Sequence, residues 1–334
     1  MTAEGIHRRI SKSASRNNNK EHELEEVKME KIVAIVGPTA SGKSSLAVRL
    51  AKDIGGEIIS CDSMQVYRQM DIGTAKIMPS EMDGVKHHLI DILDPDTDFS
   101  CADYASLARE KITEITRRGR LPIFCGGTGL YLDSVIEIPS FCDTAKDEDY
   151  RIELEKYAKE NGAHALHELL SKIDPKSAEQ IHENNVKRVI RALEIYKCTG
   201  VTKSEWDEKS RLQAPPYDST VFFLSYENKA LLYERIEKRV DMMLESGLLD
   251  EARGLFNKGF LENGTTASEA IGYKELLPYL KGEKSLDECV SDLKLSTRHY
   301  AKRQLTWFSR KNSYHKIYVD KTDAYEYIKE VLSK

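Results

Sequence analysis

Eight consecutive residues near the start of the chain have the types and spacing of a phosphate-binding loop. Glycines allow backbone N–H groups to turn inward around phosphate oxygens, a lysine adds a positive charge, and a serine hydroxyl can bind Mg²⁺. The pattern G-x-x-x-x-G-K-[ST] predicts a site for a nucleotide or for another diphosphate. It is formed by Gly37, Pro38, Thr39, Ala40, Ser41, Gly42, Lys43 and Ser44, with Ser44 as the candidate metal ligand.

A strand before the loop and a helix after it are needed to aim those N–H groups at a phosphate. The apolar run 32–36 precedes the loop and predicts a buried strand, and residues 45–54 follow it with helical periodicity. The agreement of strand, loop spacing and helix argues against a chance match in a glycine-rich turn.

An aspartate at the end of the next apolar run is the first candidate for catalysis. Residues 57–61 predict a second parallel strand, which ends at Asp62. In an open α/β sheet the ligand lies beyond the carboxyl ends of the strands, so Asp62 should stand beside the phosphate loop. A carboxylate there can act as a general base or hold a metal through water. The alternative is that Asp62 caps the next helix.

A third apolar run, 121–125, ends in a glycine-rich turn, where phosphate-loop NTPases usually have an acidic residue that holds Mg²⁺. The turn Gly126-Gly127-Thr128-Gly129 would let a substrate approach the backbone, and the Thr128 hydroxyl can donate to an anionic oxygen. A plain strand-to-helix turn is the structural alternative. A further strand is predicted within 85–93, where adjacent His87 and His88 face opposite sides and favour packing roles over metal binding.

Between the predicted strands the sequence changes character. From about residue 139 it is charged and helix-favouring, until the apolar run 220–225 restores the strand signal. The fold class predicted is therefore α/β, a parallel sheet core of the P-loop NTPase type flanked by helices, with an inserted all-helical domain. The predicted parts are a disordered tail (1–30), the first part of the core (31–139), the helical insertion (140–219), and a return to the core with a basic C-terminal helical region (220–334).

Two pairs of arginines lie on predicted helix faces. Arg188 and Arg191 are three residues apart, and Arg235 and Arg239 are four apart, so each pair shares a face. The first pair can be solvated or can contact nucleic acid. The second pair can neutralise a leaving phosphate if it faces the loop, or it can pair with acidic residues on its own helix.

The region 293–318 has seven lysines and arginines, no acidic residue, and interleaved aromatic side chains. Cations that hold phosphates and aromatic faces that stack on bases are typical of an RNA-binding surface. The alternative is that its apolar residues form the core stripe of an ordinary amphipathic helix, and both can hold on opposite faces.

Composition sets the class of protein. The 334 residues carry a net charge of −5, and no apolar run approaches the roughly 20 residues that a membrane span needs. Six scattered cysteines without a C-x-x-C pair argue against a zinc site or a disulfide framework and favour a reducing cytoplasm. The tail has no apolar segment after its arginines, so no secretory signal is expected.

Taken together, the motifs closely resemble those of the tRNA dimethylallyltransferases, also called tRNA isopentenyltransferases. The resemblance runs from Ile32 to about Ser309, and seven motifs in the family's order are far more specific than one phosphate loop. They are 37–44, 62–67 (D-S-M-Q-V-Y), 71–76 (D-I-G-T-A-K), 126–131 (G-G-T-G-L-Y), Arg188 with 191–194 (R-A-L-E), 270–275 (A-I-G-Y-K-E) and 302–307 (K-R-Q-L-T-W).

The resemblance implies that the loop binds dimethylallyl diphosphate with Mg²⁺ instead of ATP. The acceptor it implies is the N6 amine of the adenosine at position 37, next to the anticodon, in tRNAs that read codons starting with U. It further implies Asp62 as the general base, Thr128 at the reaction centre, and Arg235 or Arg239 on the diphosphate. The family places the adenine out of its stack, in a channel between core and insertion, as enzymes that act on a base must.

The resemblance also implies the surface that contacts the tRNA anticodon stem-loop. The residues carried over by position are Asp62, Ser63, Met64, Gln65, Thr128, Lys187, Arg188, Val189, Ile190, Arg191, Gly272, Tyr273, Lys274, Lys302, Arg303, Gln304 and Trp307. A monomeric cytoplasmic enzyme with no membrane partner is expected.

Elementary chemistry supports this reading. Transfer of an allyl group needs a diphosphate made into a good leaving group, which the loop, Lys43 and Mg²⁺ provide by absorbing negative charge. It also needs a positioned base, because the exocyclic amine is a poor nucleophile. An acidic residue after the strand 121–125 is not required for this reaction.

Departures from the family pattern are few. Ser44 replaces the commoner Thr and keeps the hydroxyl, Asn184-Asn185 stands where Asn-Asp is frequent, and the tail is extra. The eukaryotic C-terminal zinc finger is absent, which indicates a bacterial-type enzyme.

Two other functions compete with this prediction. One is a small-molecule kinase, or an isopentenyltransferase that acts on free adenine nucleotides, which would leave the basic aromatic region unexplained. The other is a non-catalytic RNA-binding protein gated by a nucleotide.

Overall fold

The computed structural model describes residues 29–137, 147–211 and 214–334. The predicted disordered tail lies almost entirely outside the described residues, as does the start of the predicted insertion. Residues Lys31–Lys334 form one compact unit. None of the described helices is long and apolar enough to cross a membrane.

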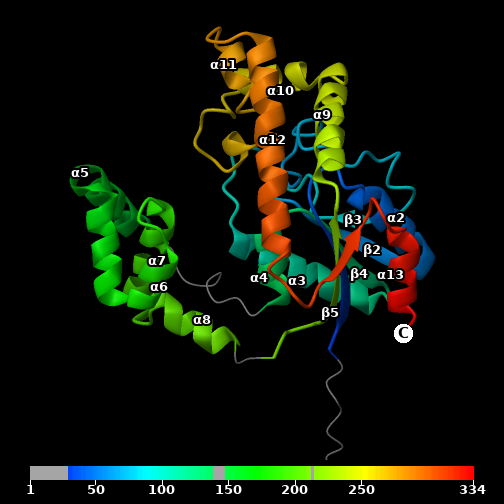
Figure 1. The fold of residues 1–334 in the computed structure, drawn as a ribbon, viewed down its shortest axis with the longest axis horizontal. Helices are drawn as coiled ribbons and strands as arrows, with labels where there is room; N and C mark the ends of the chain where they lie inside the picture. The colour runs from blue at the N-terminus through cyan, green and yellow to red at the C-terminus, as the bar shows by residue number, and fades with distance from the viewer. Residues whose placement is uncertain (1–28, 138–146, 212–213) are drawn as a thin grey trace, which may run out of the picture. The chain divides into compact units, whose positions relative to one another are not determined.

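A six-stranded sheet, parallel throughout, is the frame of this unit (Figure 1). The strand order is β3-β2-β4-β1-β5-β6. The strands are β1 (Lys31–Val36), β2 (Gly56–Cys61), β3 (His87–His88), β4 (Leu121–Gly126), β5 (Asp218–Ser225) and β6 (His315–Tyr318). This confirms the predicted α/β class and the return of the chain to the sheet after the helical region.

Helices cover both faces of the sheet, which is why its central strands are largely buried and mostly apolar. Alternate residues of β1 point to opposite sides: Ile32 and Val36 pack with helix α3, and Val33 and Ile35 pack with helix α2. The helices that complete the core are α2 (Lys43–Ile54), α3 (Cys101–Arg117), α4 (Gly129–Ile136), α9 (Lys229–Glu245), α10 (Leu248–Asn257), α11 (Leu277–Leu280), α12 (Leu286–Phe308) and α13 (Ala324–Leu332).

The register of the central strands brings three loops to one edge. Gly126 at the end of β4 pairs with Val36 of β1 on one side and with Cys61 of β2 on the other. The phosphate loop, the Asp62 turn and the glycine turn leave these three strand ends. They therefore start side by side, as the parallel sheet predicts.

Helices fill the chain between α4 and β5, as predicted. They are α5 (Glu148–Ile173), α6 (Pro175–Gln180), α7 (Val186–Thr199) and α8 (Lys203–Arg211). Gly162, with φ of 87°, interrupts the helical geometry of α5. Residues of α5, α6 and α7 share a hydrophobic cluster of their own. The insertion boundaries 140–219 remain a prediction.

Two strand expectations need correction. The strand within 85–93 pairs with β2 only at His87 and His88, because Leu89 and Asp91 adopt left-handed φ of 60° and 55° that end the extended backbone; Leu93 forms an isolated bridge with Tyr67. The histidines have the expected local roles, since His88 contacts Glu57 (2.7 Å) and His87 contacts a backbone oxygen. Strand β6 was not predicted, because only one of its four residues is buried and an edge strand of this kind lacks an apolar run.

Candidate active site

A cavity of about 270 Å³ lies where the three loops meet helices α9 and α12. Thr39, Lys43 and Ser44 of the phosphate loop line it, together with Asp62 and Gly126. Several other lining residues come from distant parts of the chain: Ser63, Met64, Gln65, Gly73, Thr74, Ala75, Arg239, Glu269, Gly272, Lys274, Thr297, Tyr300, Arg303 and Gln304. The structure therefore brings twelve of the predicted site residues, fewer than half, to one cavity.

The phosphate loop has the backbone of an anion cradle. Ala40 and Gly42 adopt left-handed φ of 62° and 84°, and Lys43 Nζ curls back to donate to the Pro38 carbonyl (2.7 Å). The Ser41 hydroxyl is buried and finds no hydrogen-bond partner among the residues that the structure describes. An unsatisfied buried hydroxyl in such a loop fits an anion, which would accept a hydrogen bond from it.

The electrostatics of the loop also fit an anionic ligand. The pKa of Lys43 is lowered to about 8, chiefly by burial and also by the neighbouring positive charge of Arg239, although Cys125 and Asp62 act in the opposite direction. Burial also lowers the pKa of Arg239. Two partly buried cations at one cavity are costly unless negative charge is supplied between them. A diphosphate would supply that charge.

Asp62 lines the same cavity and starts a turn. Its Oδ1 accepts a hydrogen bond from the backbone N–H of Met64 (3.0 Å). Turns follow it, so the alternative that Asp62 caps a helix is wrong. The local bond fixes the carboxylate at the tip of β2, where it can accept a proton from a group bound in the cavity.

The Thr128 hydroxyl contacts the same turn. Its Oγ1 accepts from the backbone N–H of Ser63 (3.0 Å), and Tyr300 is hydrogen-bonded to it from α12. Burial raises the pKa of Tyr300, so this hydroxyl keeps its proton at neutral pH. Thr128 thus connects the glycine turn to the turn that presents Asp62.

The protein's own side chains approach the glycine turn, where the sequence suggested a substrate. A Cβ on Gly127 would lie 2.0 Å from the Gln304 amide nitrogen, and a Cβ on Gly129 would lie 2.3 Å from the Trp307 ring. Gln304 accepts from Thr39 N (2.9 Å) and donates to the Gly127 carbonyl (3.0 Å). The glycines therefore let α12 pack against the phosphate loop.

The two arginines of α9 have different environments. Arg235 Nε donates to the carbonyl oxygen of Ala40 (2.9 Å), so it supports the phosphate loop from outside the cavity lining. Arg239 lines the cavity and is close enough to Lys43 and Asp62 to affect their electrostatics. Helical spacing placed Arg235 and Arg239 on one face, and the structure shows that only Arg239 of these two lines the cavity.

Five of the predicted tRNA contacts are buried in the described structure: Val189, Ile190, Gly272, Tyr273 and Gln304. Val189 and Ile190 are 0% and 4% exposed in the helical cluster, because successive residues of a helix cannot all face outward. Tyr273 is 0% exposed and donates to Glu251 (2.6 Å), and the Trp307 indole donates to Asp133 (3.1 Å). Burial argues against direct side-chain contact of Val189, Ile190 and Tyr273 with RNA, and the Trp307 N–H is already occupied. The tRNA contacts themselves stay a prediction.

Other predicted RNA contacts remain available to a partner. Lys187, Arg188, Lys302 and Arg303 are exposed. Arg191 is half-buried and pairs with Glu194 (2.5 Å), which is 0% exposed and also receives Arg151 (2.7 Å). Part of the basic C-terminal surface is neutralised as well: Lys294 pairs with Asp241 (2.6 Å), Arg298 with Glu237 (2.8 Å) and Lys311 with Asp133 (3.2 Å).

Sequence reasoning missed two residues of this site. Tyr300 lies three and four residues before Arg303 and Gln304, so all three share the cavity face of α12. That spacing was a usable signal. Glu251 on α10 binds the loop 71–73, and no local pattern marked it.

Among the described residues no cluster of three or more His, Cys, Asp or Glu could hold a metal ion.

Comparisons with known proteins agree with this geometry. The sequence model of the family described as IPP transferase matches residues 65–311. A tRNA dimethylallyltransferase from Halalkalibacterium halodurans is 53% identical over 295 residues, which make up 88% of this chain and 92% of that protein. One from Geobacillus thermodenitrificans is 53% identical over 279 residues, or 84% of this chain and 87% of the relative.

Solved structures agree as well. A full-length tRNA isopentenylpyrophosphate transferase from Bacillus halodurans aligns with a TM-score of 0.67 at 51% identity, covering 90% of this chain and 94% of that chain. A eukaryotic dimethylallyltransferase acting on tRNA aligns with a TM-score of 0.73 at 32% identity, covering 84% of this chain and 70% of that chain.

Proposed function

The chain belongs to the IPP transferase family of tRNA dimethylallyltransferases, and on that premise we propose how its cavity prenylates adenosine 37 of tRNA. One observation carries the proposal: the cations Lys43 and Arg239 and the carboxylate Asp62 line one cavity. Cations suit a departing diphosphate, and a carboxylate suits an amine that must lose a proton.

We propose that dimethylallyl diphosphate binds with its diphosphate in the phosphate loop. Thr39, Lys43 and Ser44 face the cavity, and Arg239 faces it from α9. Arg235, which holds the Ala40 carbonyl, keeps the loop in place. These groups absorb the negative charge that grows on the leaving group as the bond between carbon and oxygen breaks.

Mg²⁺ is part of this proposal. The Ser44 hydroxyl lies at the cavity, at the loop position that binds this ion in phosphate loops, and the loop's cationic surroundings fit a metal bound together with a diphosphate. When bound, the ion would neutralise the diphosphate and make it a better leaving group.

Asp62 acts on the acceptor side of the reaction, as the base for the N6 amine. The adenosine N6 nitrogen attacks the first carbon of the dimethylallyl group, a C–N bond forms, and the C–O bond to diphosphate breaks. The nitrogen then carries a proton in excess, which Asp62 accepts and passes to solvent. Held by the Met64 N–H and by the neighbouring Thr128 contact to Ser63, the carboxylate keeps its direction as the substrates change.

We further propose that the RNA enters beside Met64, Gln65, Gly272 and Lys274, which line the cavity, and beside Arg303 at its rim. Exposed Lys187, Arg188 and Lys302 would hold phosphates of the anticodon stem-loop. Preference for tRNAs that read codons starting with U, a monomeric state and a cytoplasmic location belong to the same proposal.

A transfer assay tests the proposal. The protein is incubated with radiolabelled dimethylallyl diphosphate, Mg²⁺ and either an unmodified tRNA anticodon stem-loop or AMP. Label is expected in the RNA, and nucleoside mass spectrometry should place it on the N6 amine of adenosine 37. A stem-loop with guanosine at that position is the matched control and should stay unlabelled. Label that appears only in AMP would reject the tRNA acceptor.

A further inference from the structure

We infer that Glu251 is a positioning residue for this reaction, which holds the cavity wall formed by Gly73, Thr74 and Ala75 against the acceptor RNA. The inference rests on the proposed function, because it assigns that cavity to the reaction. Glu251 is in α10 and does not line the cavity itself. It acts through the segments that it binds.

The Glu251 carboxylate is enclosed by backbone donors. It accepts from the N–H groups of Asp71 (3.0 Å), Ile72 (2.9 Å) and Gly73 (3.0 Å). Three consecutive amides that converge on one anion form a concave cradle of the kind that binds phosphates in other loops. Here the protein's own carboxylate fills the cradle, and hydrogen bonds to a charged acceptor are stronger than neutral ones.

The same carboxylate also joins a second segment of the cavity wall. Tyr273 donates from its hydroxyl to Glu251 Oε1 (2.6 Å), and its ring is 0% exposed. A Cβ on Gly73 would lie 2.5 Å from this ring, so the glycine sits directly against its hydroxyl-bearing end. Gly272, next to Tyr273, lines the cavity. Glu251 therefore couples two wall segments that lie far apart in the sequence.

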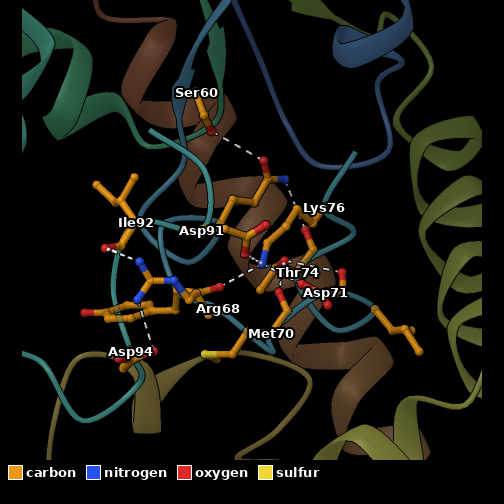
Figure 2. Close-up of polar contacts among 12 residues, drawn as sticks. Ser60, Arg68, Met70, Asp71, Thr74, Lys76, Asp91, Ile92 and Asp94 are labelled. Atoms are coloured by element: carbon orange, nitrogen blue, oxygen red, sulfur yellow. Dashed lines mark hydrogen bonds and ion pairs between the residues drawn. The ribbon is translucent and has the colours of Figure 1, made fainter. Parts of the chain in front are cut away.

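The segment is fixed at its other end by a polar network (Figure 2). Lys76, only 7% exposed, contacts the carboxylates of Asp71 and Asp91 and donates to the carbonyl oxygen of Tyr67 (2.7 Å). Gln65 donates weakly to the carbonyls of Thr74 (3.3 Å) and Ala75 (3.4 Å). Since Gln65 belongs to the Asp62 turn, a shift of the wall would disturb the acceptor side of the site.

The proposed diphosphate ligands are supported separately. Lys43 and Ser44 belong to α2 and its loop, and Arg239 belongs to α9. Loss of Glu251 should therefore weaken productive binding of RNA much more than binding of dimethylallyl diphosphate. A general loss of folding would instead reduce both in proportion.

The variant Glu251→Gln tests this difference. Glutamine offers one acceptor oxygen and adds an NH₂ donor, so it cannot satisfy three backbone N–H groups and the Tyr273 hydroxyl together. We expect the KM for the anticodon stem-loop to rise at least about tenfold, while the Kd for dimethylallyl diphosphate, measured by calorimetry without RNA, changes less than about threefold.

Two further variants serve as matched controls. Asp250 is the preceding residue of the same helix, is exposed and pairs only locally with Arg253 (2.9 Å) in the described structure, so Asp250→Asn should leave both constants unchanged. Tyr273→Phe removes one donor and keeps the ring beneath Gly73. It should raise the KM for RNA in the same direction as Glu251→Gln but by less.

Amide hydrogen exchange gives a readout that needs no catalysis. In Glu251→Gln the amides of residues 71–73 should exchange at least about tenfold faster, with the rest of the sheet unchanged. The inference is overturned if exchange and KM both match the unaltered chain, or if affinity for both substrates falls together with the folded fraction. If the unaltered chain transfers no prenyl group to RNA, the proposed function fails, and the exchange experiment still decides the role of Glu251.

Discussion

At the scale of single residues, the site separates opposite charges within one cavity. Burial lowers the pKa of Lys43 to about 8 and also lowers that of Arg239, so both cations are poised to receive an anion. Asp62 follows β2, which is separated in the sheet from β1 and its phosphate loop by β4 alone. Its carboxylate accepts a hydrogen bond from the Met64 N–H. This arrangement lets one group of residues stabilise the leaving diphosphate while another accepts a proton.

Replacing Asp62 tests the base. In Asp62→Asn the side chain keeps its size and can still accept from Met64 N, but it cannot take up a proton. The rate of prenyl transfer should fall at least about 100-fold, the usual worth of a general base, while RNA affinity in a filter-binding assay stays within about threefold. Asp53→Asn, at an exposed ion pair with Lys329 (3.8 Å), is the matched control. Turnover of Asp62→Asn near that of the control would remove Asp62 from this role.

The depressed pKa of Lys43 predicts a pH dependence. Its ammonium form binds the diphosphate, and that form is lost as pH rises through about 8. The Kd for dimethylallyl diphosphate should therefore be flat below the pKa and about tenfold weaker one pH unit above it, by titration of a single group. Calorimetry from pH 6.5 to 9.5 measures this. Lys43→Arg stays charged throughout, so its affinity, although weaker, should show no such fall; a parallel decline in both proteins would contradict the assignment.

At the scale of elements, α12 is the helix that completes the cavity. Gln304 joins it to the phosphate loop and the glycine turn, and Trp307 joins it to α4 through Asp133. Burial and the nearby Glu137 raise the pKa of Asp133 to about 6, although Lys311 and Trp307 partly oppose this. Gln304 and Trp307 occupy the positions where Gly127 and Gly129 would carry a Cβ, so the packing of α12 requires these two glycines.

Two glycine substitutions separate packing from intrinsic helix preference. In Gly129→Ala the new Cβ would meet the Trp307 ring at 2.3 Å, so α12 must shift. The free energy of unfolding, measured with urea, should drop by about 1–3 kcal/mol, as for other overpacked sites. Gly254→Ala in α10 meets nothing within 4 Å and should gain up to about 1 kcal/mol from helix propensity. Equal effects of the two changes would refute the packing role.

At the scale of the whole molecule, the net charge does not show which lysines and arginines are exposed and which are paired with carboxylates. The chain carries −5 overall, yet Lys302, Arg303 and Arg310 are exposed on or just after α12. Lys294 and Arg298 on the same helix are tied to carboxylates of α9. The exposed cations are available to RNA phosphates, as Lys187 and Arg188 are on α7, whereas Lys294 and Arg298 are already paired. The basic surface of α12 is therefore smaller than the sequence suggested.

Salt dependence tests this division. Each cation that neutralises an RNA phosphate adds about 0.7–0.9 to the slope of log K against log salt, because counterions are released. Lys302→Gln should lower affinity for the stem-loop and reduce this slope by about one such increment. Lys294→Gln, whose charge Asp241 already neutralises (2.6 Å), should change the slope by less than half of that. A slope near zero for the unaltered protein would rule out phosphate binding as the main contribution.

Much of this protein is determined by local sequence. The phosphate loop and most of the apolar strands follow from short-range periodicity and backbone preferences, and their types were predicted correctly. The meeting of the loop with Asp62 also followed, because parallel strands end at one edge of a sheet. These features depend on neighbours within a few residues or on a general rule of topology.

Only the tertiary structure decided which side chains face the cavity. The bond from Thr39 to Gln304 spans 265 residues, and that from Ile72 to Glu251 spans 179. Such contacts leave no periodic trace, so the sequence could not separate Arg239 from Arg235 or reveal that Tyr273 is buried on Gly73. Periodicity records which face of an element is apolar, but the partner that covers this face is set by how distant segments pack together.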